Sequence, residues 1–212
     1  MAKSLLLDID GVIVRDPLLL QHVKDNCARY VAHKMPECKD PVRTNEHLYL
    51  AHGHTARGLQ MTFNKDTSDF HEKVYDKRLM DHLTEVIYGT DFQKEAEIIH
   101  DFTRKGWDVT LFTNAPEQWA TPIALAIGDT IGIKCAGPDA STSHFKTDSS
   151  FYKGFPGNTH FYVDDSLKNL GAARFLPNWR AIHFTEGPKE RRSWCPQISS
   201  IQELALFLRF TR

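Results

Sequence analysis

Acidic, hydroxyl and amide side chains follow three short apolar runs of the sequence. If these runs are parallel strands, their carboxyl ends meet at one edge of a sheet, which is where such sheets bind ligands. Four carboxylates at one edge repel one another unless a cation neutralises them, and oxygen ligands suit a hard ion such as Mg²⁺. One acidic pair could simply cap the helix that follows it, but two acidic pairs and a Thr–Asn pair favour a metal and anion site. The residues concerned are Asp8, Asp10, Thr113, Asn114, Asp164 and Asp165.

The elements that must position these side chains alternate between strands and helices. Four apolar runs are typical of buried parallel strands: residues 5–7, 107–112, 159–163 and 179–184. Three segments have the pattern of helices: residues 92–105, 167–175 and 201–209. Ser200 and Glu203 form a plausible capping box for the last of them. The alternation predicts an α/β fold with a doubly wound, Rossmann-like parallel sheet.

A different pattern occupies residues 16–91, between the first and second predicted strands. Apolar residues recur there at helical spacing, and the segment contains no convincing buried strand. We therefore expect an all-helical cap domain at residues 16–91, inserted into a Rossmann-like core formed by residues 1–15 and 92–212.

The composition is that of an ordinary soluble globular protein, with 41% hydrophobic and 25% charged residues among 212. Lys and Arg total 26 against 27 Asp and Glu, so there is no global basic field to hold a nucleic-acid backbone. A small basic patch at residues 189–192 is the exception. Four widely spaced cysteines suit free thiols in a reducing compartment. The first residues do not form a signal peptide or membrane span, so we expect a cytoplasmic protein without membrane contact.

Four segments together resemble the signature motifs of the haloacid dehalogenase (HAD) superfamily. Their residues and sequences are 8–12 (DIDGV), 111–114 (LFTN), 146–152 (KTDSSFY) and 161–166 (FYVDDS), the last continuing through Asn169 to Ala172 and Ala173. The motifs occur in the order of the family and at suitable spacing, so the resemblance covers nearly the whole predicted core.

The resemblance implies the chemistry of phosphate esters. Asp8 would be the nucleophile that forms an aspartyl-phosphate, and Asp10 would act as general acid and then general base. The Thr113 hydroxyl and the Asn114 backbone amide would hold the phosphoryl oxygens. Lys146 would offset the charge between the nucleophile and the phosphate, two anions that otherwise repel.

The cofactor that the resemblance implies is Mg²⁺. Asp8, the backbone carbonyl of Asp10 and Asp165 would bind it, and Asp164 would do so directly or through water. Two other lysines, Lys153 and Lys168, compete with Lys146 for the role of the charged lysine. The match that continues from Lys146 through Asp148 to the aromatic pair at residues 151–152 favours Lys146.

Part of the predicted cap resembles the cap of pyrimidine 5'-nucleotidase-type members of the superfamily. Residues 47–59 read HLYLAHGHTARGL, in which Tyr49 and Arg57 become candidate substrate-binding residues. Guanidinium pairs well with phosphate or a base carbonyl, although an ordinary place on a helix surface is the competing interpretation of Arg57. Three histidines of this stretch, His47, His52 and His54, also allow a zinc site, but they lack a fourth ligand at a recognisable spacing.

Together these patterns predict a Mg²⁺-dependent phosphomonoesterase for a small phosphorylated substrate, with nucleoside 5'-monophosphates as the expected class. A phosphotransferase or mutase would use the same motifs and differ only in the acceptor. A polynucleotide end phosphatase is disfavoured by the near-neutral charge. A non-catalytic binding protein is disfavoured because the candidate nucleophile and metal ligands are all present. The leaving group and the oligomeric state stay open at this point.

Overall fold

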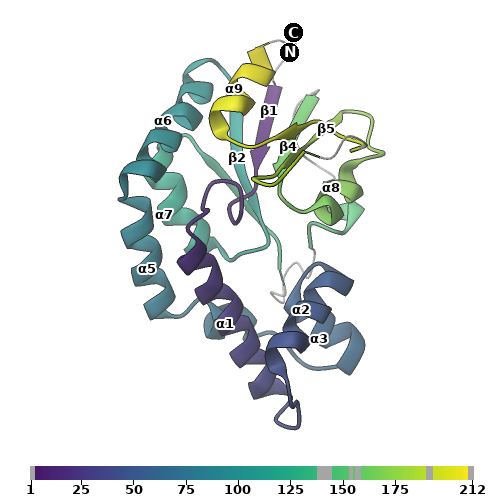
Figure 1. The fold of residues 1–212 in the computed structure, drawn as a ribbon. Coiled ribbons are helices and arrows are strands. Elements are labelled where there is room, and N and C mark those ends of the chain that lie inside the picture. The colour runs from purple at the N-terminus through teal and green to yellow at the C-terminus, as the bar shows by residue number, and fades with distance from the viewer. Residues whose placement is uncertain (1–2, 138–144, 153–154, 156–158, 190–192, 210–212) are drawn as a thin grey trace.

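The computed structural model describes residues 3–137, 145–152, 155, 159–189 and 193–209, and its centre is a six-stranded sheet (Figure 1). The strands are β1 (Lys3–Leu7), β2 (Asp108–Thr113), β3 (Gly132–Cys135), β4 (Thr159–Asp164), β5 (Trp179–Phe184) and β6 (Gln197–Ile198). They are parallel throughout, in the order β3-β2-β1-β4-β5-β6. In this order the winding reverses between β1 and β4, and doubly wound sheets bind ligands beside such a reversal.

Alternate side chains of the strands contribute to two separate cores. Leu5 and Leu7 of β1 join a core that includes α6 (Thr90–Arg104), α7 (Glu117–Ile127) and α9 (Ile201–Arg209). Leu6 joins the opposite core, with α8 (Leu167–Ala173) and the 3₁₀ helix η1 (Ser149–Tyr152). Because both faces of the sheet are covered, the strands are continuous apolar runs in the sequence.

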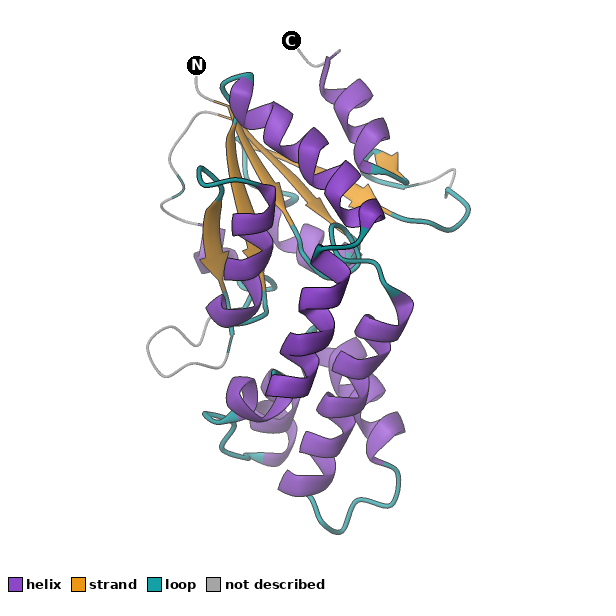
Figure 2. Ribbon diagram, turned by 90° about the vertical axis from the view of Figure 1, so that its left-hand side faces the viewer, coloured by secondary structure: helices purple, strands orange, loops and turns teal. Residues whose placement is uncertain are grey.

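Five helices lie between β1 and α6. They are α1 (Pro17–Lys34), α2 (Pro41–His52), α3 (Thr55–Phe63), α4 (Phe70–Val74) and α5 (Lys77–Ile87). Asp16, Asp40 and Asp76 cap α1, α2 and α5 by accepting hydrogen bonds from backbone amides, at 2.7, 3.0 and 2.9 Å. Pro17 and Pro41 occupy the first turns of α1 and α2, where no amide hydrogen is needed. Figures 1 and 2 show these helices beyond the carboxyl ends of the strands.

The predicted fold class, a doubly wound parallel sheet flanked by helices, is confirmed. The four predicted strands agree with β1, β2, β4 and β5 to within two residues, and the three predicted helices correspond to α6, α8 and α9. The division into a core and a cap at residues 15/16 and 91/92 stays a prediction. Helix α6 begins at Thr90, before the predicted boundary, and α5 contacts both α6 and α7.

Three elements of the sheet layers were not predicted. Strand β3 is half-buried and contains Gly132 and Lys134, β6 has only two residues, and α7 contains Pro122, so none has the expected pattern.

At α9, the Ser200 hydroxyl caps the Glu203 amide at 3.1 Å as predicted, but the Glu203 carboxylate accepts from the amide of Ser199 instead of Ser200. All four cysteines are free thiols. The described helices are each too short or too polar to traverse a lipid bilayer.

Candidate active site

The two acidic segments meet because β1 and β4 are neighbours in register. Leu7 pairs with Val163, and the amide of Asp8 then donates to the Val163 carbonyl at 2.9 Å. This pairing places Asp8 next to Asp164, the last residue of β4. On the other side of β1, Leu7 pairs with Leu111, which brings the end of β2 at Thr113 to the same edge.

Lys146 bridges the acids at these two strand ends. Its Nζ lies 2.8 Å from Asp8 Oδ1 and 2.6 Å from Asp164 Oδ2, and its side chain is 1% exposed. Burial alone would lower the pKa of Lys146, but Asp164 and Asp8 outweigh burial and hold that pKa above its usual value. Lys146 is therefore a fixed positive charge at the edge of the sheet.

Asp164 is held more firmly than any other acid of the site. Its carboxylate accepts hydrogen bonds from the Tyr162 hydroxyl, the Ser166 amide at 2.8 Å and the Asn169 side chain at 3.1 Å, in addition to Lys146. The side chain has no exposed surface. Asp164 thus fixes Lys146 and the turn into α8.

Three carboxylates form a compact oxygen cluster that fits a cation. Asp8, Asp164 and Asp165 each place one oxygen within 4.8 Å of the others. Burial, followed by repulsion from Asp164, raises the pKa of Asp8 well above its usual value, and Lys146 offsets only part of this. Asp165 is more exposed, yet desolvation and Asp164 raise its pKa to about 7. A hard divalent ion bound to these oxygens would relieve the repulsion, so the donor set suits Mg²⁺.

Gly11 permits the close approach of Asp165. Its φ is +85°, in the region that favours glycine, and a Cβ at this position would collide with the Asp165 carboxylate. The glycine after the two acids of the first motif therefore shapes the acidic edge of the site.

Asp10 has a partner that the sequence did not reveal. The indole Nε1 of Trp119, a fully buried residue of α7, donates to Asp10 Oδ1 at 3.0 Å. Desolvation raises the pKa of Asp10 to about 6, although the hydrogen bond from Trp119 and the charge of Lys146 oppose the shift. The sequence does not predict this role of Trp119, because no local pattern relates two residues that are 109 positions apart. This carboxyl group is fixed at one oxygen and can exchange a proton at the other.

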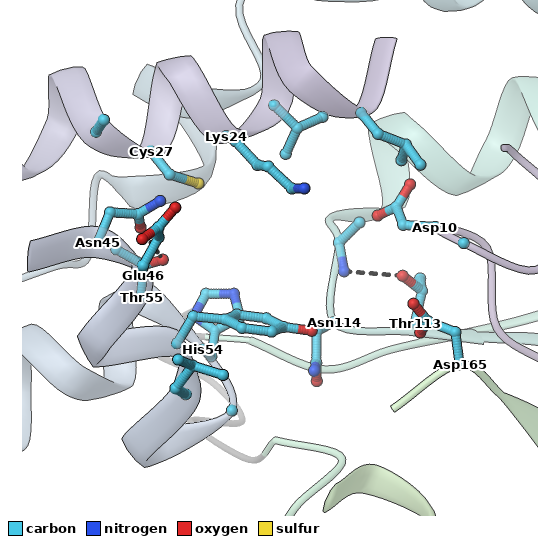
Figure 3. A pocket seen from close by; sticks show the side chains of 18 of the residues that line it. Asp10, Lys24, Cys27, Asn45, Glu46, His54, Thr55, Thr113, Asn114 and Asp165 are labelled. Carbon is cyan, nitrogen blue, oxygen red and sulfur yellow. Dashed lines mark hydrogen bonds between the residues drawn. The ribbon is translucent and has the colours of Figure 1, made fainter. Parts of the chain in front are cut away.

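Thr113 and Asn114 lie where the sequence predicts them, and both line the central cavity. The Thr113 hydroxyl accepts from the Ala115 amide at 3.0 Å, an interaction drawn in Figure 3. Because that contact uses a lone pair, the hydroxyl hydrogen is left for another acceptor. The Asn114 side chain accepts from the Lys146 amide at 3.0 Å and so anchors the segment that carries the lysine.

A cavity of about 600 Å³ extends from these acids into the inserted helices. Asp10, Thr113 and Asp165 lie at its core end, and Asn45 and His54 lie at its opposite, cap side (Figure 3). Asp8, Lys146 and Tyr49 also line the cavity. The volume falls in the usual range for small-molecule sites. Of the two predicted cap contacts, Tyr49 lines the cavity, and the residue is 47% exposed.

Arg57 lies outside the set of described residues that line the cavity. Its Nη1 pairs with Asp148 Oδ1 at 2.7 Å and donates to the Thr147 hydroxyl at 2.5 Å. The guanidinium also lies 5.5 Å from the centre of the Phe145 ring. In this structure Arg57 therefore joins α3 to the segment that contains Lys146.

Lys168, one of the two competing lysines, and two of the three histidines have other partners. The Lys168 amine donates to the Leu50 carbonyl, and Lys153 lies outside the described residues. His47 is exposed, His52 pairs with the Thr62 hydroxyl at 3.0 Å, and His54 caps α3. These positions give no zinc cluster within the part of the chain that the structure describes.

No protein-family model and no curated protein sequence matches the chain. Among solved structures, a HAD phosphatase from Thermococcus onnurineus has a TM-score of 0.59 and 17% identity, over 97% of both chains. A 2-haloacid dehalogenase from Pseudomonas syringae pv. Tomato DC3000 has a TM-score of 0.56 and 15% identity, over 100% of both chains. YfnB from Bacillus subtilis, described as a HAD-hydrolase bound to magnesium, has a TM-score of 0.52 and 14% identity over 99% of both. Identities this low bear on the fold alone, and the chain has the fold of the HAD-superfamily hydrolases.

Proposed function

We propose that the protein is a Mg²⁺-dependent phosphomonoesterase that hydrolyses a small phosphate ester through an aspartyl-phosphate on Asp8. The observation that carries the proposal is the buried Lys146 ammonium, 2.8 Å from Asp8 and 2.6 Å from Asp164, at the switch point of the sheet. This arrangement gives a carboxylate nucleophile a fixed positive charge where an anionic phosphoryl group must approach.

In the first step an oxygen of Asp8 attacks phosphorus, and the bond between phosphorus and the ester oxygen breaks. The proton of Asp10 goes to the leaving oxygen, for which a pKa of about 6 is well placed near neutral pH. Trp119 holds the other Asp10 oxygen at 3.0 Å and so orients the carboxyl group. Lys146 and the Thr113 hydroxyl stabilise the charge on the phosphoryl oxygens.

In the second step Asp10, now ionised, takes a proton from water as that water attacks phosphorus. The bond between Asp8 and phosphorus breaks, inorganic phosphate leaves, and both carboxyl groups return to their initial states. Mg²⁺, held by Asp8 and Asp165 with Asp164 beside them, would supply charge neutralisation to the carboxylates and the phosphate. Lys146 holds the Asp8 and Asp164 carboxylates in place before the attack.

The substrate class that we propose is a nucleoside 5'-monophosphate or a similar small ester. It is supported by the size of the cavity, about 600 Å³, and by the tyrosine ring of Tyr49 on its cap side. The helices α1 to α5 lie beyond the strand ends (Figure 2), and the cavity that several of them line has a volume that suits a small leaving group.

The test is phosphate release from a panel of phosphorylated metabolites, with purified protein in EDTA and after addition of Mg²⁺. We expect turnover in water only with Mg²⁺, and the fastest rates with small monoesters. Full activity after exhaustive chelation contradicts the metal dependence. If phosphate is transferred only when an acceptor is added, the protein is a phosphotransferase and not a hydrolase.

A further inference from the structure

Two buried polar side chains lie at the cap end of the cavity, opposite the acids. Asn45 of α2 and His54, which precedes α3, are each 8% exposed and both line the cavity. Figure 3 shows them across the cavity from Asp10 and Thr113, on the side where the leaving group of a bound ester would extend. Each side chain accepts one hydrogen bond, at 3.1 Å for His54 and 2.6 Å for Asn45, and has a further nitrogen that can donate.

The protonation state of His54 follows from its contacts. Its Nδ1 accepts a hydrogen bond from the Ala56 amide at 3.1 Å, and a backbone amide can only donate. Burial, with smaller contributions from His71 and Arg57, lowers the pKa of His54 to about 3. The ring is therefore neutral with its hydrogen on Nε2, and the described residues include no acceptor for it. Phe70 and Phe145, with ring centres at 5.0 and 4.8 Å, hold the ring in place.

Asn45 is a second donor in the same region. Its Oδ1 accepts from the Thr55 hydroxyl at 2.6 Å, which fixes the orientation of the amide. The amide nitrogen then lies on the side away from Thr55 (Figure 3), where no described residue accepts its hydrogens. The cap end thus presents two neutral donors, each oriented by a bond at its other polar atom.

The charges along the cavity argue against a second phosphate at this end. Among the described lining residues the cations are Lys24 and Lys146, and Lys146 already pairs with Asp8 and Asp164. Asp25 and Glu46 also line the cavity, so the charge of Lys24 is balanced within the lining. A site for a second phosphate normally offers arginine or several cations.

We infer that His54 and Asn45 bind an oxygen acceptor on an uncharged far end of the leaving group. This inference rests on the proposed phosphatase activity and narrows its substrates to monophosphates whose other end carries a carbonyl or hydroxyl oxygen. A sugar bisphosphate is excluded as a preferred substrate. A carbonyl of a base and a hydroxyl of a sugar offer the same acceptor chemistry, and the choice of esters separates them.

The experiment compares steady-state kinetics of His54→Asn with the unaltered protein. Asn retains a good N-cap for α3 but removes the Nε2 donor. Uridine 5'-monophosphate offers carbonyls and hydroxyls, ribose 5-phosphate offers hydroxyls, phenyl phosphate offers neither, and fructose 1,6-bisphosphate adds a second phosphate. We expect KM to rise about threefold to tenfold for esters with the recognised oxygen, the effect of one neutral hydrogen bond. KM for phenyl phosphate should not change.

A rise in KM for uridine 5'-monophosphate alone identifies the base carbonyl as the recognised oxygen. A rise in KM for both uridine 5'-monophosphate and ribose 5-phosphate identifies a sugar hydroxyl. Asn45→Asp keeps the oxygen that accepts from Thr55 and removes both donor hydrogens. This variant should raise KM for the same esters. His47→Asn changes an exposed histidine of α2 in the same way and serves as the matched control. An equal rise of KM for phenyl phosphate, or preference for the bisphosphate, overturns the inference.

The inference about the cap end can be tested separately from the phosphatase proposal. If no ester is hydrolysed with Mg²⁺, calorimetric titration with uridine and with ribose still measures the cap end directly. Binding that weakens in His54→Asn and survives in His47→Asn supports the donor pair without any turnover. Absence of binding by both compounds to the unaltered protein rejects it.

Discussion

The core end and the cap end of the cavity are built by different means. At the core end, backbone pairing between β1 and its neighbours fixes Asp8, Thr113 and Asp164, so their positions follow from strand register. At the cap end, His54 and Asn45 depend on side-chain bonds to Ala56 and Thr55 across helix ends. Strand register at the core end suits a reaction that needs fixed geometry. Side-chain bonds at the cap end allow substitutions that alter substrate recognition without disturbing the sheet.

The strongest test of this difference is Asp8→Asn at the core end. Removing the nucleophile should lower kcat on the order of 10³-fold or more for every ester. Folding should survive, because the raised pKa of Asp8 shows that its charge is unfavourable there and Lys146 keeps its bond to Asp164. Phosphate release and thermal melting of the purified variant check both parts. Near-normal turnover rejects Asp8 as the nucleophile.

Asp10→Asn should lower kcat by an amount that depends on the leaving group of the ester. Substitutions at the cap end should not produce this dependence. The variant cannot protonate the leaving oxygen, so alkyl phosphates should lose about 10²-fold to 10⁴-fold in kcat. With p-nitrophenyl phosphate, whose leaving group needs little protonation, the first step should be much less impaired. Burst kinetics of p-nitrophenol release isolate that step. Equal impairment on both kinds of ester would assign Asp10 to metal binding alone.

Most of the core end could be predicted from the sequence, whereas the cap end could not. Asp8, Asp164 and Asp165 directly follow or end buried strands, and the sheet brings such positions together whatever the helices do. The Trp119 bond to Asp10 and the Arg57 pair with Asp148 join residues 109 and 91 positions apart, so no local pattern encodes them. His54 was visible as one of three clustered histidines, but its single orientation depends on the start of α3.

Arg57 tests whether the two ends act independently. Asp148 accepts from the Phe145 amide at 2.9 Å and pairs with Arg57, so it closes the turn that carries Lys146. Loss of Arg57 should therefore disturb Lys146, and Arg57→Ala should lower kcat/KM about tenfold for nucleotides and p-nitrophenyl phosphate alike. A substrate contact, the role that the sequence suggests, would instead raise KM for nucleotides and spare p-nitrophenyl phosphate.

The matched variants distinguish these two roles of Arg57. Asp148→Asn should reproduce the loss, and the double variant should be little worse than either single one, because all three break the same pair. Arg104→Ala removes an exposed arginine that pairs with Asp101 on α6 and should leave the kinetics unchanged. Additive losses from Arg57→Ala and Asp148→Asn would mean that the two residues act separately.

The last expected effect is a pH dependence of stability in which the two ends of the cavity act in opposite directions. Asp10 and Asp165 have pKa values raised from 3.8 to about 6 and about 7, so the folded protein binds more protons than the unfolded chain. These two carboxyl groups therefore stabilise the metal-free protein at pH 4 and lose that contribution as the pH rises to 7 and beyond. His54, whose pKa is lowered to about 3, acts in the opposite direction, because its contribution is lost as the pH falls. Mg²⁺ binds the ionised carboxylates and should raise the melting temperature most at the alkaline end. Melting curves in EDTA and in Mg²⁺ across this range measure both trends. In EDTA, Asp165→Asn should gain melting temperature relative to the unaltered protein as the pH rises from 4 to 7, whereas Asp91→Asn, at a fully exposed position on α6, should not. The absence of this gain in Asp165→Asn would contradict the crowding of carboxylates at the end of β1 and β4.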